Sequence, residues 1–397
     1  MKYGIITQYY KSTNYGGNLQ AYALCMALKK LGIEAEQICY PTKGKKHFVK
    51  DIKTYINERG MVIGLLKGGK AIIGSCQKRI KSIVHFKHLK SLKEKTAKKQ
   101  QAFLYFNSSV IPHSENVYND SDLYLLADKY DGLIVGSDQV WNPDQYRPGY
   151  FLEGIPAKKK KIAYAVSIAK ESLSDLQKEA YAQRLKAFDM ISVREHKAID
   201  ILRPLTEKEI YYTADPTLLL DAKDWEKITD KKMLDVPYAF CYFLGRNKKS
   251  RKMASEYARL HNLKLMGIPM AISNYELIDS EAYDIVLSFA TPGEFLSGIM
   301  NAEVVFTDSF HACVFSHIFN RPFVVFQREN DGRMSSRIDS LMGLFDSSIM
   351  FMKDNQEISP AKIEENLRKV DFNKKTEAEN VLIDKSYKFL MKSCGIK

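Results

Sequence analysis

Residues 303–326 have the sequence EVVFTDSFHACVFSHIFNRPFVVF, and their pattern predicts the fold class. Val304 to Phe306 form a short apolar run that is typical of a buried strand. The next three residues, Thr307 to Ser309, are of the kinds that cap helices, and the apolar residues after them recur at helical spacing. Phe323 to Phe326 predict a second strand. Such a strand–helix–strand crossover builds parallel sheets, whose ligands bind beyond the carboxyl ends of the strands.

His311 falls in the first turn of the helix predicted within this stretch. Unpaired N–H groups at a helix N-terminus attract anions, so a bound phosphate would lie beside the imidazole. A histidine placed there can protonate a substrate once an anion has docked. The structural alternative is a histidine that only bonds a neighbouring carbonyl group.

Length and composition predict a globular protein with two domains. The 397 residues are 45% hydrophobic and 27% charged, and a chain of this length supports two cores. The six cysteines show no C-x-x-C pair and no zinc-ligand spacing, so we expect reduced structural thiols and no metal site. The N-terminus has no apolar signal-peptide core, and no stretch approaches the ~20 apolar residues of a membrane span. A cytoplasmic protein is expected.

The formal charge of +13 is concentrated in one segment. Residues 43–99 contain seventeen lysines and arginines against three acidic residues. Short apolar runs interrupt these charges, which suits a peripheral helix on anionic lipid at the inner face of the plasma membrane. A solvated helical hairpin is the alternative. Nucleic-acid binding is not predicted, because no recognised reading motif accompanies the charge.

Hydrophobic periodicity predicts two α/β domains in succession. The βαβ opening of the chain carries Asn14-Tyr-Gly-Gly-Asn18 where its helix begins, and glycine there lets the backbone approach a ligand closely. The predicted parts are residues 1–221 for the first domain, 43–107 for a basic helical insertion in it, 222–358 for the second domain, and 359–397 for a helical tail, with packing back on the first domain as one option.

Polar loops at the ends of predicted strands supply further candidate site residues. A buried strand that ends at Gly136 is followed by Asp138 and Gln139, which suit a second wall of a site. A short strand predicted at residues 191–194 ends in Arg194, whose guanidinium suits the binding of a carboxylate or phosphate. An ion pair between Arg194 and Glu195 or Asp189 is the structural alternative.

The end of the first domain carries its own predictions. We expect residues 211–220 to form its last strand, with Asp215-Pro216 turning the chain. Residues 221–236 are expected to form a polar helical join between the two domains.

Several of these pieces together resemble the polysaccharide pyruvyl transferase family. The matching motifs are NYGGNLQAYAL at residues 14–24, GSDQVWN at 136–142, SVRE at 192–195, DPTL at 215–218 and TDSFH at 307–311. The resemblance implies a GT-B-like fold, in which two Rossmann-like parallel-sheet domains face a cleft. It also implies transfer of a pyruvyl group from phosphoenolpyruvate to two hydroxyls of a sugar. The product would be a ketal in a cell-surface glycan or in its lipid-linked precursor, made without a cofactor.

The motif positions imply roles for individual residues. His311 would be the catalytic histidine, and Arg194 an arginine that binds phosphoenolpyruvate. His311 suits protonation of the donor's methylene carbon. Asp138 suits acceptance of a proton from the sugar hydroxyl, with helix capping or turn formation as its alternative. The candidate catalytic residues are therefore His311 and Asp138, and the candidate substrate-binding residues are Arg194, Asn14, Gly16, Asn18, Gln139, Arg246, Ser309 and Arg337.

The chain departs from the family pattern at one position. Other branches of the family have Arg-Leu-His where this chain has Ser309-Phe-His311. The work of the arginine expected at position 309 would pass to Arg246, Arg333 or Arg337, unless the donor differs.

Two other function classes stay open on the residues alone. The first is a glycosyltransferase of the same architecture that uses a nucleotide sugar. The second is a non-catalytic adaptor held at an anionic membrane surface, which rests only on residues 43–99. The preferred interpretation has phosphoenolpyruvate and a saccharide acceptor as partners, with no nucleic acid.

Overall fold

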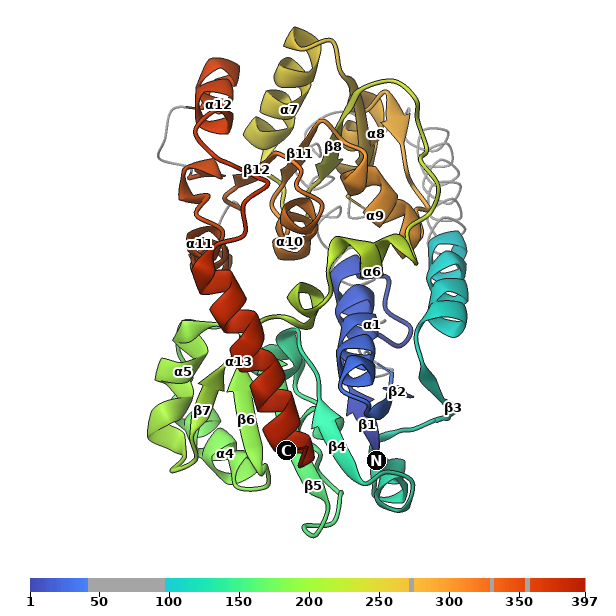
Figure 1. The fold of residues 1–397 in the computed structure, drawn as a ribbon, viewed down its shortest axis with the longest axis vertical. Helices are drawn as coiled ribbons and strands as arrows, with labels where there is room; N and C mark the ends of the chain where they lie inside the picture. The colour runs from blue at the N-terminus through green and yellow to red at the C-terminus, as the bar shows by residue number, and fades with distance from the viewer. Residues whose placement is uncertain (42–96, 271–274, 329–331, 354–357, 397) are drawn as a thin grey trace, which may run out of the picture.

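The computed structural model describes residues 1–41, 97–270, 275–328, 332–353 and 358–396 (Figure 1). Most of the basic insertion predicted at residues 43–107 lies outside the described residues. Its described part belongs to a helix at residues 97–110. The proposed association of this segment with a membrane therefore stays a prediction.

Two parallel sheets form the cores of two domains, which confirms the predicted fold class. Sheet A has seven strands in the order β3-β2-β1-β4-β5-β6-β7, and sheet B has six in the order β10-β9-β8-β11-β12-β13. The strands of sheet A are β1 Lys2–Ile6, β2 Glu34–Cys39, β3 His113–Val117, β4 Gly132–Val135, β5 Lys160–Val166, β6 Met190–Val193 and β7 Ile210–Tyr212. Those of sheet B are β8 Tyr238–Tyr242, β9 Lys264–Ile268, β10 Ile285–Val286, β11 Val304–Thr307, β12 Phe323–Phe326 and β13 Phe351–Met352.

Helices cover the sheets on both sides. The α-helices are α1 Tyr15–Lys30, α4 Asp175–Leu185, α5 His196–Leu202, α6 Ala222–Glu226, α7 Lys248–Leu260, α8 Tyr275–Ala282, α9 Pro292–Met300, α10 Phe310–Ile318, α11 Gly332–Leu344, α12 Pro360–Leu367 and α13 Glu377–Cys394. The short 3₁₀ helices are η1 Asp120–Asp128, η2 Gln139–Trp141, η3 Pro143–Gln145, η4 Pro148–Phe151, η5 Arg203–Leu205, η6 Pro216–Leu219 and η7 Ser348–Met350.

The strand order reverses at one point in each sheet. In sheet A the reversal lies between β1 and β4, and in sheet B it lies between β8 and β11. Ligands of open parallel sheets bind beyond the carboxyl ends of the strands at such a reversal. The fold therefore marks two places at which binding residues are expected.

The stretch at residues 303–326 forms the predicted crossover. β11 pairs with β8 on one side and with β12 on the other, and α10 connects β11 to β12. Ser309 is the N-cap residue of α10 and has extended backbone angles. After the helix, Asn320 has a φ of 55°, the left-handed conformation that asparagine tolerates where helices end.

Two local predictions near the end of the first domain are wrong. The strand expected at residues 211–220 is only β7, because Asp215 caps η6 with its side chain and Pro216 lacks the N–H that a strand ladder requires. Of the helical join expected at residues 221–236, only α6 is helical. The residues that follow Lys227, the C-cap residue of α6, are irregular.

The C-terminal helix joins the two domains. In Figure 1, α13 runs from the side of α11 down along sheet A, so the chain ends close to its beginning. Ser386 Oγ accepts a hydrogen bond from the Ala214 N–H, and the Tyr387 hydroxyl donates to the Leu219 carbonyl. The Tyr3 hydroxyl donates to the Cys394 carbonyl at 3.4 Å. The domain boundaries expected at residues 221 and 358 stay predictions.

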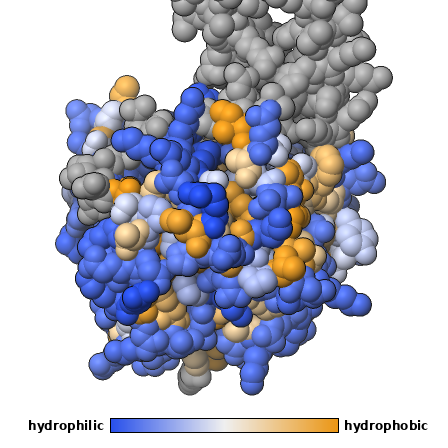
Figure 2. Space-filling model, turned by 90° about the horizontal axis from the view of Figure 1, so that it is seen from above, coloured by the Kyte–Doolittle hydropathy of each residue, from blue (hydrophilic) through white to orange (hydrophobic). Residues whose placement is uncertain are grey.

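Figure 2 shows that the second domain, seen from above, is mainly hydrophilic, with apolar side chains gathered near the middle of the view. In the part of the chain that the structure describes, no helix has the length and apolarity needed to span a bilayer.

Candidate functional site

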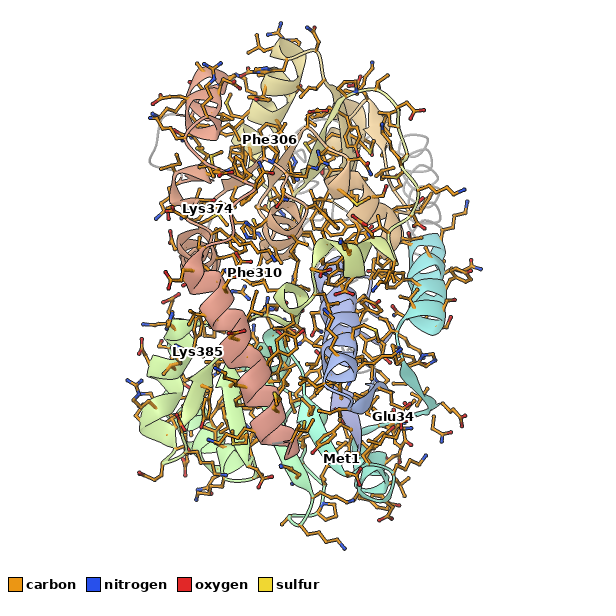
Figure 3. The ribbon with its side chains drawn as sticks, viewed as in Figure 1. Met1, Glu34, Phe306, Phe310, Lys374 and Lys385 are labelled. Atoms are coloured by element: carbon orange, nitrogen blue, oxygen red, sulfur yellow. The ribbon has the colours of Figure 1, made fainter. Side chains whose placement is uncertain are left out.

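The candidate residues gather where the carboxyl ends of strands from both sheets meet. Asp138 follows β4 and Arg194 follows β6, whereas His311 follows β11 of the second domain. Phe310, beside His311, lies between the two domains in Figure 3. The Arg194 guanidinium carbon is 4.9 Å from the centre of the Phe310 ring, so the two domains are in contact here.

His311 lies against the first turn of α1. A Cβ added at Gly16 would overlap His311 Nδ1, so only glycine leaves room for the ring. His311 Nε2 lies 3.8 Å from Asp215 Oδ2, and the side chain keeps 10% of its surface exposed. Nε2 itself is buried and has no hydrogen-bond partner among the described residues. A buried polar atom of this kind indicates a place for a ligand or water.

Asp215 stays ionised beneath this imidazole. Its Oδ2 accepts hydrogen bonds from Ser137 Oγ at 2.9 Å and from Arg194 Nη1, and its Oδ1 accepts from the N–H and Oγ1 of Thr217. Burial would raise the pKa of Asp215, but Arg194, His311 and Thr217 outweigh burial and hold the pKa below its usual range. A fixed negative charge therefore lies within reach of His311.

Arg194 ties together carboxylates from two loops. Its Nη1 bonds Asp215, and its Nη2 lies 3.1 Å from Asp138 Oδ1. These partners differ from the Glu195 and Asp189 of the structural alternative. Burial would lower the pKa of Arg194, but the surrounding carboxylates raise it. Its Nε, also buried, has no hydrogen-bond partner among the described residues.

The backbone at Asp138 is strained. Its φ is 76°, a left-handed value that is uncommon for residues other than glycine. The Asp138 carbonyl accepts from the Ser167 N–H at 2.9 Å, which holds the turn against the neighbouring strand β5. A Cβ added at Gly17 would lie 3.5 Å from Asp138 Oδ2, so the second carboxylate oxygen faces the start of α1. The strain aims this carboxylate into the cluster.

A second ion pair crosses between the domains. Arg337 of α11 places Nε 3.8 Å from Glu195 Oε2 and donates from Nη1 to Ser167 Oγ at 3.4 Å. The Glu195 carboxylate also accepts from Ser167 Oγ and from the N–H groups of Ile168 and Ala169. Burial lowers the pKa of Arg337, Glu195 opposes this, and the charges of Arg194 and Arg328 lower it further. Arg337 therefore senses the positive charges of both Arg194 and Arg328, and an anion bound beside Arg337 would offset them.

Arg328 and Asp308 complete the second-domain side of the site. Asp308 follows β11 and accepts from the N–H groups of Leu244 and Gly245, both at 2.7 Å. Arg328 donates from Nη2 to the Asp308 carbonyl at 2.9 Å, and its Nε lies 3.4 Å from Asp308 Oδ1. The loop after β8 and the loop after β12 are therefore held together at the point where sheet B reverses its strand order.

The other predicted residues have supporting positions. Asn14 caps α1 by accepting from the Gly17 N–H at 3.2 Å, and Asn18 Nδ2 donates to the carbonyls of Ser12 and Asn14. Gln139 accepts from Asn142 Nδ2 at 3.1 Å.

Two more predicted residues lie at the second-domain edge of the site. The Ser309 N–H donates to Thr307 Oγ1 at 3.0 Å. Arg246 is exposed at the rim, next to Gly245. The side chain of Arg333, the third arginine weighed for position 309, is outside the described part of the chain.

Sequence reasoning missed four charged members of the cluster. Asp308 directly follows β11, Asp215 lies shortly after β7, and Glu195 follows Arg194, so their positions beyond strand ends were an available signal. Arg328 also lies shortly after a strand, β12, but its contact with Asp308 forms only when β12 pairs with β11. Within the described residues, no group of three or more His, Cys, Asp or Glu side chains is arranged to hold a metal ion.

Comparisons with known proteins agree with the fold and the motifs. A family model described as polysaccharide pyruvyl transferase matches residues 14–330. The solved UDP-GlcNAc 2-epimerase from Methanocaldococcus jannaschii aligns with a TM-score of 0.50 and 13% identity, over 98% of this chain and 100% of that one. The UDP-N-acetylglucosamine 2-epimerase from Rickettsia bellii aligns with a TM-score of 0.50 and 12% identity, over 99% and 96% of the two chains. At these identities the similarity concerns the fold alone. No curated protein sequence matches the chain.

Proposed function

The chain belongs to the polysaccharide pyruvyl transferase family, and from that membership we propose that it moves a pyruvyl group from phosphoenolpyruvate to a sugar of a cell-surface polysaccharide or its lipid-linked precursor. One observation carries the proposal: the buried His311 Nε2 has no hydrogen-bond partner among the described residues, in a site that also gathers the guanidinium groups of Arg194, Arg328 and Arg337. An acid beside a cluster of cations suits an anionic donor that must be protonated on carbon.

The reaction requires one proton on carbon and two new C–O bonds. The first sugar hydroxyl adds to C2 of phosphoenolpyruvate while C3 takes a proton, so the methylene becomes a methyl group. Phosphate then leaves C2 with the electron pair of the broken C–O bond, and the second hydroxyl adds in its place. The two hydroxyls release two protons in all. One replaces the proton given to C3, and the other leaves with the phosphate.

In this proposal His311 and Asp138 divide the proton transfers. His311 donates from Nε2 to C3 of the donor as general acid. The charge of Asp215, 3.8 Å from that nitrogen, stabilises the imidazolium before the transfer. Asp138 accepts the proton of the attacking hydroxyl through its Oδ2, because its Oδ1 is held by Arg194.

The donor's anionic groups need cations and N–H donors. Arg328 and Arg337 take the donor-binding role of the arginine that is missing at position 309. The first N–H groups of α10 also bind the anionic donor. Both Nη atoms of Arg194 bond to carboxylates, those of Asp138 and Asp215, so only its Nε is available to contact the donor. Its main role is to position the two carboxylates.

The test is release of phosphate from phosphoenolpyruvate in the presence of saccharide acceptors, run in D₂O. We expect acceptor-dependent release and one solvent deuteron in the methyl group of the ketal. His311→Ala should lower kcat by about 10²–10⁴-fold, the usual contribution of a general acid, with the thermal unfolding midpoint unchanged. The matched control is His261→Ala, since His261 is partly exposed at the end of α7, away from the cluster. Full turnover by His311→Ala would refute the acid role.

A second measurement separates this proposal from a nucleotide-sugar glycosyltransferase. Thermal unfolding is followed with phosphoenolpyruvate and with UDP-sugars in turn. Stabilisation by phosphoenolpyruvate supports pyruvyl transfer. Stabilisation by a nucleotide sugar alone would favour the glycosyltransferase.

Action on a lipid-linked acceptor at the inner face of the plasma membrane is part of the proposal, and its check is co-sedimentation with anionic vesicles that weakens as salt rises.

A further inference from the structure

A groove of about 840 Å³ lies along β7, the edge strand of sheet A. Residues 209–213 form one wall, α13 forms the other, and part of α11 contributes to the lining. None of the residues assigned to catalysis or donor binding lines this groove. It is a separate surface whose purpose pyruvyl transfer does not explain.

The strand wall presents backbone groups to the groove. The Thr213 N–H donates to the Val193 carbonyl of β6 at 3.0 Å, so it points into the sheet. Since alternate residues of a parallel strand bond to opposite sides, the N–H and C=O groups of Ile210 and Tyr212 point away from β6. No acceptor for these two N–H groups occurs among the described residues. The next outward N–H, that of Ala214, is already taken by Ser386 Oγ at 2.8 Å, which sets one end of the open edge.

The two edges of sheet A differ. At the opposite edge, the register of β3 against β2 shifts between Gln37 and Cys39, and irregularities of this kind protect an edge against pairing. β7 instead pairs with β6 in unbroken register over its three residues. The β7 edge is therefore the one that can accept another strand.

The helix wall is apolar in its middle and basic along its outside. Val381 is 44% exposed, and Leu382 and Phe389 lie buried behind it. Lys385 and Lys388 are exposed on the same face of α13, and Figure 3 shows Lys385 beside the first domain. Residues three, four and seven apart share one face of a helix, so this basic stripe extends to Lys392.

Acidic groups in the lining are fewer. Glu209 is its one carboxylate, and it already accepts from the Tyr211 hydroxyl. The Lys392 ammonium donates to that same hydroxyl at 2.8 Å. Lys385 and Lys388 thus face the groove without a carboxylate opposite them in its lining.

We propose that this groove binds an extended acidic peptide segment of a partner protein, which adds to sheet A as a strand beside β7. The outward backbone groups of Ile210 and Tyr212 would form the ladder. Side chains alternate between the two faces of a strand, and α13 lies on the face to which Tyr211 points, so every second side chain of the peptide would face α13 and place its carboxylate near Lys385 or Lys388. A second copy of this chain is the less suitable occupant, since pairing the two edges would set the same lysines against each other.

The probe is an acetylated peptide of alternating glutamate and valine, about eight residues long, labelled for fluorescence anisotropy. We expect binding that weakens with salt. Amide hydrogen exchange on the full chain should show new protection at Ile210 and Tyr212. The double variant Lys385→Glu, Lys388→Glu should weaken binding at least about tenfold. The matched control is Lys178→Glu, since Lys178 is an exposed lysine on α4. Phosphate release should not change in any of these variants, because no lysine of the groove belongs to the site.

Three outcomes would overturn the proposal. The first is no binding of the peptide. The second is binding that persists in the double variant or leaves Ile210 and Tyr212 unprotected. The third is a protein that does not bind the peptide but binds vesicles of anionic lipid, and loses this binding in the double variant. That result would make the basic stripe a membrane contact. A peptide N-methylated at alternate residues tests the ladder directly: it should lose binding, and binding as strong as that of the parent peptide would count against strand addition.

Discussion

A buried arginine–aspartate cluster lies in each domain. The two clusters contain the same residue types, but they differ in whether all of their buried polar atoms have hydrogen-bond partners. In the second domain, Arg251 Nε lies 2.5 Å from Asp279 Oδ1, and Arg251 Nη1 donates to the carbonyls of Gly245 and Asn247. The Asp279 carboxylate also accepts from the Met270 N–H at 2.9 Å. This pair links α7, α8 and the loops around them, and it holds the domain together.

The cluster around Arg194 is equally buried but incomplete. Arg194 bonds Asp215 and Asp138, yet its Nε and the neighbouring His311 Nε2 have no hydrogen-bond partner among the described residues. A buried polar atom without a partner costs about 1–3 kcal/mol, so it persists where a ligand or water supplies the missing bond. Burial and charge therefore do not distinguish a site from a structural pair. Between these two clusters, the completeness of hydrogen bonding is the difference.

The substitution Arg251→Met should cause the largest loss of stability. The change leaves Asp279 buried without its cation, which should lower the free energy of unfolding by about 3–5 kcal/mol. Urea unfolding at neutral pH measures the loss, with Lys252→Met as the control because Lys252 is exposed on the same helix. Turnover per folded molecule should stay at the level of the parent. A loss of turnover at full stability would make Arg251 part of the site.

Asp215→Asn should have a smaller effect on stability and a clear dependence on pH. Arg194 keeps Asp138 as a partner, so we expect a loss of about 1–3 kcal/mol at pH 7, together with reduced turnover. The folded state holds the pKa of Asp215 below the value of ~3.9 of a free aspartate. Its carboxylate therefore stabilises the fold above about pH 4, and this contribution is lost as the pH falls through the folded pKa.

Denaturant unfolding of Asp215→Asn and of the parent at a series of pH values checks this. The difference between the two should be constant from pH 7 to about pH 5 and shrink below about pH 4. A difference that grows in acid would contradict the assignment of an ionised Asp215.

The smallest effect is expected from an ion pair outside both clusters. Asp224 contacts Lys30 at 2.5 Å and Lys227 at 2.8 Å near the surface. Burial opposes ionisation there, but the two lysines lower the pKa of Asp224 to about 2. Asp224→Asn should cost less than about 1 kcal/mol at pH 7, and the cost should fall away below about pH 4, as the aspartate protonates. A larger loss of stability would make the ion pair of Asp224 a structural one, like that of Arg251 and Asp279.

Local sequence patterns were enough for the elements on which the site is built. Apolar runs, capping residues and the glycines of α1 placed β11, α10 and the start of α1 correctly. The patterns were insufficient at residues 211–220, where Asp215-Pro216 began a 3₁₀ helix and the carboxylate turned toward Arg194. Periodicity reports burial along one element, so it cannot report which loop meets which.

Neighbouring residues in the chain were sufficient to predict the two parallel sheets, the crossover whose helix begins beside His311, and the family motifs. The positions of His311 over Gly16 and above Asp215, and of Arg337 beside Glu195, follow from the packing of the folded chain. These contacts join residues far apart in the chain, and their energies depend on burial and on the charges already present. A linear pattern records neither.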